Sequence, residues 1–185
     1  MSIDKGRFAR DMDLVKSMRM GMDECHVALR ESYADLADKE FWAYPLEGRN
    51  NIATIIMHCL QQHDDFNGNL QSRLNRRARH EWHFLKHEER FGLWGLPPEK
   101  LPKPGDEFPS VNEVVALHDE LHENIIRNMT ELPAEEFESG PAGQWPKLCD
   151  MFFRGIYHVN AHIRQIWFLR GLMGIDRHYP LQHFA

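Results

Sequence analysis

Residues 146–174 read PKLCDMFFRGIYHVNAHIRQIWFLRGLMG, and they carry the pattern that decides the fold class. Pro146 suits the first turn of a helix, and Gly174 is placed to end one. His158 and His162 lie four residues apart, so their side chains project from one helical face about one turn apart. The other residues on that face are mostly apolar or small, namely Met151, Gly155, Gln165 and Leu169. The stretch therefore predicts a helix from Pro146 to Met173 that carries a histidine pair toward the protein interior.

Three further stretches have apolar residues at helical spacing, and none shows the alternation that is typical of strands. They run from Asp4 to Asp38, from Asn51 to Ala78, and from Ser110 to Pro133. Ser110 and Glu113 have the spacing of a capping box at the start of the last of these. Four amphipathic helices must bury their apolar faces against one another. The sequence therefore predicts an all-α four-helix bundle.

The segment between the second and third predicted helices breaks the helical pattern. It runs from His80 to Pro109 and includes GLPPEKLPKPGDEFP, which has five prolines and two glycines. Such a segment cannot continue a helix, and we interpret it as a long crossover within one fold. Because 185 residues is near the usual size of one domain, we expect a single domain over residues 1–185.

Composition excludes several classes of function. The formal net charge of -6 argues against a general nucleic-acid binder. No run approaches the roughly 18 apolar residues of a membrane span, and the start, MSIDKGRFARDMD, is too charged for a secretory signal. The three cysteines are widely spaced and include no CxxC, which is typical of reduced thiols. We therefore expect a cytoplasmic protein that acts on a small molecule, and we leave a homodimer open.

Histidine is the enriched residue, with 12 in the chain, and His58 lies in the most apolar part of the second predicted helix. A lone histidine there is usually a satisfied core residue, and an HxxxH pair is more often a surface coincidence. Together, however, His58, His158 and His162 could form a three-nitrogen site. His58 lies roughly 10 Å and His158 roughly 18 Å from the start of its helix. If the two helices run parallel, a stagger of one or two turns brings these side chains to the same height. Cys59 points about 100° away from His58 and is not expected to be a ligand.

Two segments resemble a known family. LEGRNNIATIIMHCLQQHDDF and YHVNAHIRQIWFLRGLMG are similar to the second and fourth helices of the DinB/YfiT-like metalloenzymes of the DinB superfamily. The resemblance implies a four-helix bundle in which His58, His158 and His162 bind a divalent metal. Some members are transferases or isomerases that use a low-molecular-weight thiol such as bacillithiol or mycothiol. For them the implied role of the metal is to activate the thiolate.

The three imidazoles themselves suit zinc, nickel, iron or copper, and their spacing does not choose among these metals. Three neutral ligands leave the ion its full charge, which would acidify a bound water or thiol. We therefore predict a metal-dependent thiol transferase or hydrolase. No general base stands out, although Gln165 is placed to support the metal or its water. The alternative is a non-catalytic helical module with a structural metal or a partner-binding role.

Two other histidine groups compete for a function. His118 and His122 share a face of the third predicted helix, but the zincin motif needs Glu where Asp119 stands. We interpret them as a solvated or partly buried face without a third ligand nearby. His80, His83 and His87 follow a basic run from Arg73 to Arg79. Three interpretations compete for this region: a solvated helix extension, a pocket wall for anionic groups, or a nucleic-acid patch, which the acidic remainder of the chain disfavours. For a pocket wall, Arg76, Arg79 and His83 are the candidate substrate-binding residues.

Overall fold

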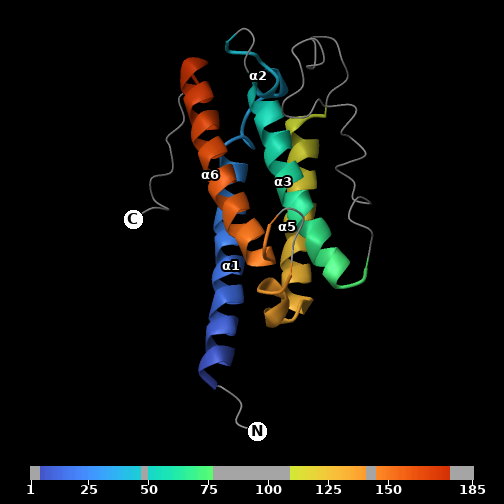
Figure 1. The fold of residues 1–185 in the computed structure, drawn as a ribbon. Coiled ribbons are helices and arrows are strands. Elements are labelled where there is room, and N and C mark those ends of the chain that lie inside the picture. Colours follow the sequence, from blue (N-terminus) through green and yellow to red (C-terminus); the bar gives the residue numbers. More distant parts are fainter. Residues whose placement is uncertain (1–4, 47–49, 77–108, 141–144, 176–185) are drawn as a thin grey trace.

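The computed structural model describes residues 5–46, 50–76, 109–140 and 145–175, with side chains from residue 14 onward. Four long helices lie side by side in a bundle (Figure 1): α1 (Lys5–Glu31), α3 (Ile52–Arg73), α5 (Val111–Glu131) and α6 (Leu148–Leu172). A short α2 (Asp38–Phe41) follows α1, and a 3-10 helix, η3 (Ala134–Phe137), follows α5. The prediction of an all-α four-helix bundle is confirmed.

The direction of the helices differs from the simple up-and-down order. α3 and α5 begin at the same end of the bundle. At this end the side-chain amide of Asn51 donates to Trp42 O, and the indole of Trp42 donates to Pro109 O. They also end together, where Arg76 binds Asn128 and Glu131 on α5. α1 and α6 run the opposite way (Figure 1). The expectation that the second and fourth helices run parallel is therefore wrong: α3 and α6 are antiparallel.

The reason is the connection between α3 and α5. Residues 77–108, on which most of the predicted crossover falls, lie outside the described residues. The end of α3 and the start of α5, which these residues join, lie at opposite ends of the bundle. The connection must therefore span the length of the bundle. A long connection permits parallel neighbouring helices, whereas a short one would force them to be antiparallel.

The ends of α3, α5 and α6 follow local signals. The Asn51 side chain accepts a hydrogen bond from the Thr54 amide at 2.8 Å and caps α3. The predicted capping box of Ser110 and Glu113 is present at the start of α5. Gly174, with φ +67°, ends α6 in the left-handed conformation that glycine adopts without strain. These ends keep the helices in register and thereby fix the height of the side chains discussed below.

Two predicted helix ends are wrong. The first helix stops at Glu31 and not at Asp38, because the chain turns there while Tyr33 and Leu36 remain buried. The second stops at Arg73 and not at Ala78, and Asn75 has a left-handed φ of 54°. In both cases the apolar or basic pattern continues past the residue at which the backbone leaves the helix, so periodicity alone could not locate the end.

All four long helices supply buried apolar side chains to one core, which includes Met22, Leu29, Ile56, Leu60, Leu121, Ile125, Val159 and Ile166. The core also holds a buried guanidinium: Arg170 donates to Ser32 O at 2.8 Å and to both carboxylate oxygens of Asp35. This contact joins the end of α6 to the end of α1.

Among the described residues, no helix has the length and apolar character needed to cross a bilayer.

Candidate metal centre

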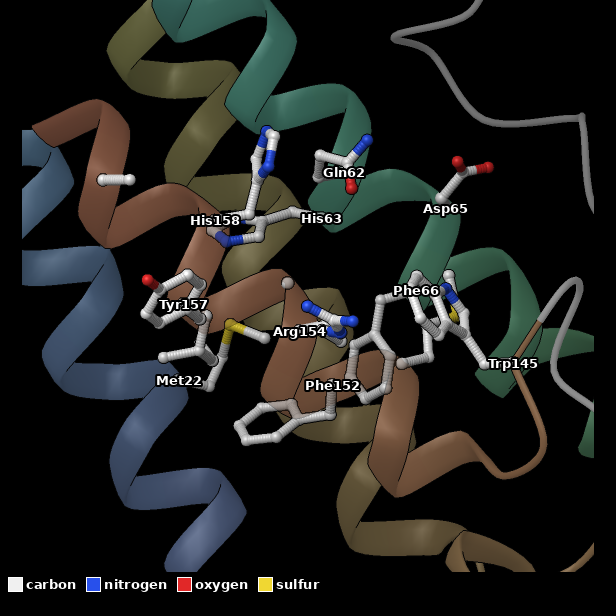
Figure 2. Close-up of a pocket in the computed structure, with 14 residues that line it drawn as sticks. Met22, Gln62, His63, Asp65, Phe66, Trp145, Phe152, Arg154, Tyr157 and His158 are labelled. Atoms are coloured by element: carbon white, nitrogen blue, oxygen red, sulfur yellow. The ribbon is translucent and has the colours of Figure 1, made fainter. Parts of the chain in front are cut away.

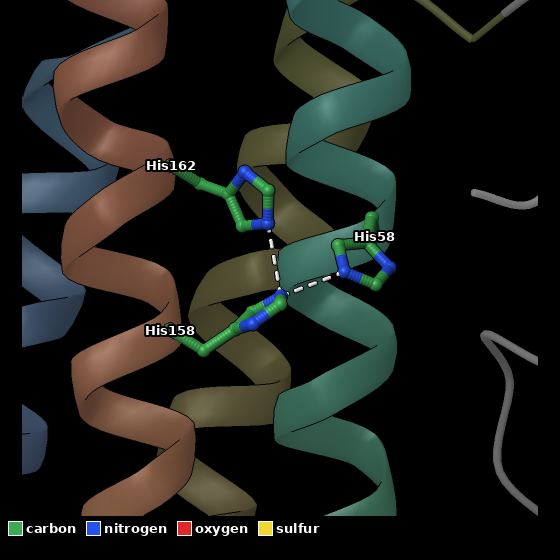
Figure 3. Close-up of side chains that lie close together, drawn as sticks. All are labelled: His58, His158 and His162. Atoms are coloured by element: carbon green, nitrogen blue, oxygen red, sulfur yellow. Dashed lines mark hydrogen bonds between the residues drawn. The ribbon is translucent and has the colours of Figure 1, made fainter. Parts of the chain in front are cut away.

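Three imidazoles meet between α3 and α6 (Figure 3). His58 reaches the site from the second turn of α3, and His158 and His162 reach it from consecutive turns of α6. His158 Nε2 lies 2.8 Å from His58 Nε2 and 2.9 Å from His162 Nε2. In the described part of the chain, this is the one group whose three candidate ligand atoms all lie within 4.8 Å of one another. We call these residues the histidine triad.

The protons of the triad cannot satisfy both short contacts at once. Gln165 Oε1 lies 2.7 Å from His162 Nδ1, so this nitrogen carries the proton and His162 Nε2 carries a lone pair. A single proton on His158 Nε2 points along one of its two contacts at a time. A cation that accepts three lone pairs would satisfy all three nitrogens. The triad therefore fits a metal ion by the chemistry of its donors.

Burial keeps the triad uncharged. The pKa of His58 is lowered from 6.5 to about 4, chiefly by burial and to a smaller extent by the neighbouring His162 and His158. Burial also lowers the pKa of His158 and of His162, although the hydrogen bond to Gln165 opposes the shift for His162. Neutral imidazole is the form that ligates a metal. The environment therefore keeps these side chains competent as ligands at neutral pH.

The spacing of the triad is near that of a tetrahedral site. Nitrogens at 2.0–2.1 Å from a tetrahedral zinc ion are about 3.3 Å apart, so the observed contacts would lengthen by about 0.5 Å. Neutral nitrogen donors without a carboxylate favour zinc, nickel, copper or iron over magnesium or calcium. The site would thus hold a transition metal with three protein ligands.

A cavity of about 570 Å³ extends from the triad along α3 and α6 (Figure 2). His158 forms part of its wall, and so do aromatic side chains of both helices and of the chain before α6. Two charged side chains, Asp65 and Arg154, also line it. The guanidinium of Arg154 lies 5.5 Å from the centre of the Trp145 ring. The full lining is Met22, Gln62, His63, Asp65, Phe66, Trp145, Met151, Phe152, Arg154, Gly155, Ile156, Tyr157, His158 and Ala161.

The structure brings together the three imidazoles that the sequence singled out and places Gln165 beside them. It gives no support to the predicted substrate-binding role of Arg76, which pairs with Glu131 and Asn128 on α5 and does not line the cavity. Arg79 and His83 lie outside the described residues. Sequence reasoning missed Arg154, although it stands four residues before His158 and hence on the same face of α6.

The face of α5 that carries His118 and His122 is partly buried, as predicted. His118 is 1% exposed and its Nε2 lies 3.2 Å from Nδ1 of His26 on α1, while His122 is half-buried. Two further imidazoles, those of His26 and His63, contact this pair, although among the described residues the nitrogens of these four side chains do not form a group of three within 4.8 Å. The motif spacing in the third helix could not reveal neighbours that other helices contribute.

The fold and the site define an α-helical bundle protein with a three-histidine cluster that could hold a divalent metal. The family model of the DinB superfamily matches residues 22–166. This match covers most of the chain and both helices that carry the triad, and the chain belongs to the DinB superfamily. Neither the curated proteins nor the solved structures give a match.

Proposed function

We propose that the protein is a metal-dependent enzyme that acts on a small molecule, with His58, His158 and His162 as metal ligands. The observation that carries the proposal is the position of His158, which belongs both to the triad and to the cavity wall. Three protein ligands are typical of catalytic sites, whereas structural sites usually have four. When bound, the metal would supply a positive charge that acidifies a thiol or a water.

The residues of the cavity would bind and orient the reactants. Phe66, Phe152 and Trp145 offer apolar surface for the body of a small molecule. Arg154 places a positive charge on the same wall and would attract an anionic group such as a carboxylate. Gln165 holds His162 in the tautomer with its lone pair on Nε2.

We favour transfer of a low-molecular-weight thiol over hydrolysis. In this reaction the thiol loses its proton to solvent, the thiolate forms a carbon–sulfur bond with the electrophile, and the leaving group departs with the electron pair. Activation of a thiolate needs only positive charge, whereas hydrolysis usually needs a positioned base as well. Among the described residues that line the cavity, Asp65 is the one carboxylate, so the cavity offers a single candidate for such a base.

The test is a panel of cellular thiols with a chromogenic electrophile, run with zinc-, nickel- or iron-loaded protein and with chelated protein. We expect at least one thiol to react faster than the uncatalysed background, and His158→Ala to lose this excess. Arg154→Gln should raise the KM of an anionic thiol and leave that of an uncharged thiol unchanged. Arg164→Gln, an exposed change on the same helix and outside the cavity, is the matched control.

Rates equal to background with every thiol and every metal would contradict thiol transfer. If the same protein also failed to cleave a panel of small esters and amides, the enzymatic proposal would be wrong. A metal-loaded structure with a fourth protein ligand would then favour the alternative hypothesis, a non-catalytic module in which the metal joins α3 to α6.

A further inference from the structure

A second group of histidines lies between α1, α3 and α5, separate from the triad. It consists of His26 on α1, His63 on α3, and His118 and His122 on α5, and we call it the α5 cluster. The rings of His26 and His122 are stacked with their centres 4.0 Å apart, and His118 meets His26 edge-on at 4.4 Å. His63 lies 6.1 Å from His118 between ring centres. Four imidazoles from three helices thus share one interior region.

Three of these rings have one nitrogen in contact with a side-chain oxygen atom. His26 Nε2 lies 3.2 Å from Asp119 Oδ1, and His122 Nε2 lies 3.0 Å from Asp23 Oδ1. His118 Nδ1 lies 3.0 Å from the hydroxyl of Tyr33. An oxygen partner on one nitrogen orients the ring and directs the lone pair of the other, which is the arrangement that metal-binding histidines usually have.

The remaining nitrogens of the cluster are the candidate donors. His26 Nδ1 and His118 Nε2 lie 3.2 Å apart, close to the roughly 3.3 Å between two ligands of a tetrahedral zinc ion. His122 Nδ1 and His63 Nε2 are buried and have no hydrogen-bond partner. His63 is 4% exposed, so the protein has placed a polar atom in its interior without a partner. Such an arrangement is costly unless another group binds there.

We propose that the α5 cluster is a second metal site, with His26 Nδ1, His118 Nε2, His122 Nδ1 and His63 Nε2 as ligands. A site of four neutral nitrogens would take zinc, nickel, cobalt or copper(II) and would reject magnesium and calcium. Four protein ligands leave no position for a substrate, so this metal has a structural role. It would join α1, α3 and α5, whereas the triad joins α3 and α6.

The α5 cluster is less contracted than the triad, since its nitrogens do not form a group of three within 4.8 Å. Binding therefore requires the rings of His122 and His63 to shift toward the His26–His118 pair, and the stacked rings of His26 and His122 to tilt apart so that their in-plane lone pairs converge. This shift costs no hydrogen bond at their inward nitrogens, because those atoms have none. The competing arrangement is a chain of hydrogen bonds without metal, in which Tyr33 donates to His118, His118 to His26, and His26 to Asp119.

The proposal is tested by counting bound metal after equilibrium dialysis with zinc, nickel, cobalt and copper(II) separately. With zinc, wild-type protein should bind two ions per chain and His158→Gln/His162→Gln should retain one. Adding His26→Gln and His122→Gln should lower the affinity for that ion at least about 100-fold, since two direct ligands are lost. Adding Glu24→Gln, an exposed change on α1, should leave it unchanged. A folded His158→Gln/His162→Gln protein that binds none of the four metals would overturn the proposal.

A second measurement covers the case in which the variants fail to fold. Long-range proton–nitrogen spectra of the wild-type imidazoles report which ring nitrogens change when zinc is added. We expect shifts at His26, His63, His118 and His122 in addition to the triad. Shifts confined to the triad would leave the hydrogen-bonded chain as the function of the α5 cluster and overturn the metal site. Neither result depends on whether the protein is an enzyme.

Discussion

Gln165 provides a sharp test of how the triad is held. Its Oε1 lies 2.7 Å from His162 Nδ1, and this contact keeps the lone pair of His162 on Nε2, which faces His158. Gln165→Ala removes that restraint, and losses of this kind cost 10–100-fold in metal affinity, or about 1.4–2.8 kcal/mol. Gln165→Glu keeps an oxygen in place and adds charge, so it should bind metal at least as tightly as the wild type.

The assay is a competitive zinc titration against a chromophoric chelator. It is carried out in a His26→Gln/His122→Gln background, so that the α5 cluster does not contribute. Arg164→Ala, an exposed change next to Gln165, is the matched control and should leave the dissociation constant within about twofold. Equal affinities for Gln165→Ala and the parent protein would show that Gln165 does not hold His162 for metal binding. So would a loss in Gln165→Glu as large as that in Gln165→Ala.

Three further predictions concern the stability of the metal-free protein. The pKa of His58 is lowered from 6.5 to about 4, chiefly by burial, so the unfolded state binds more protons between these pH values, and the free energy of unfolding should fall by up to about 3 kcal/mol as pH drops through this window. Urea unfolding at pH 7 and pH 4.5 measures this fall, and equal midpoints would contradict it. Arg170→Ala should cost at least about 2 kcal/mol in urea unfolding, because Asp35 and Ser32 O lose their buried donor, whereas exposed Arg164→Ala should cost under about 0.5. Asn51→Ala removes the cap of α3 and should lower the free energy of unfolding by about 1 kcal/mol, and an unchanged urea midpoint would show that the cap contributes nothing.

The four helices could be predicted because each has a local signal that acts within one turn. The pair of Ser110 and Glu113 begins α5, and Gly174 ends α6, as the sequence indicates. The ends at Glu31 and Arg73 were missed, because buried Tyr33 and the basic run continue the pattern beyond the helix. Helix direction could not be predicted either, since a connection as long as residues 77–108 permits both orders.

The triad could be predicted because two of its members lie on one face of α6 and the third lies in an apolar helix. Periodicity and spacing carry that information, and the resemblance to the DinB superfamily added the pairing of the two helices. The α5 cluster has no such pattern. His26, His63 and His118 stand on three different helices, and only the packing of α1, α3 and α5 brings them together. Arg154 was available from its spacing to His158, yet the cavity that gives it meaning arises from tertiary structure.

The most direct test of the central claim is a crystal structure of the zinc-loaded protein with anomalous diffraction data collected at the zinc edge. We expect an anomalous peak about 2.0–2.1 Å from Nε2 of His58, His158 and His162, with a non-protein fourth ligand on the side of the cavity. Zinc-loaded crystals without a peak at the triad, with His158 Nε2 still in contact with both neighbouring imidazoles, would contradict it.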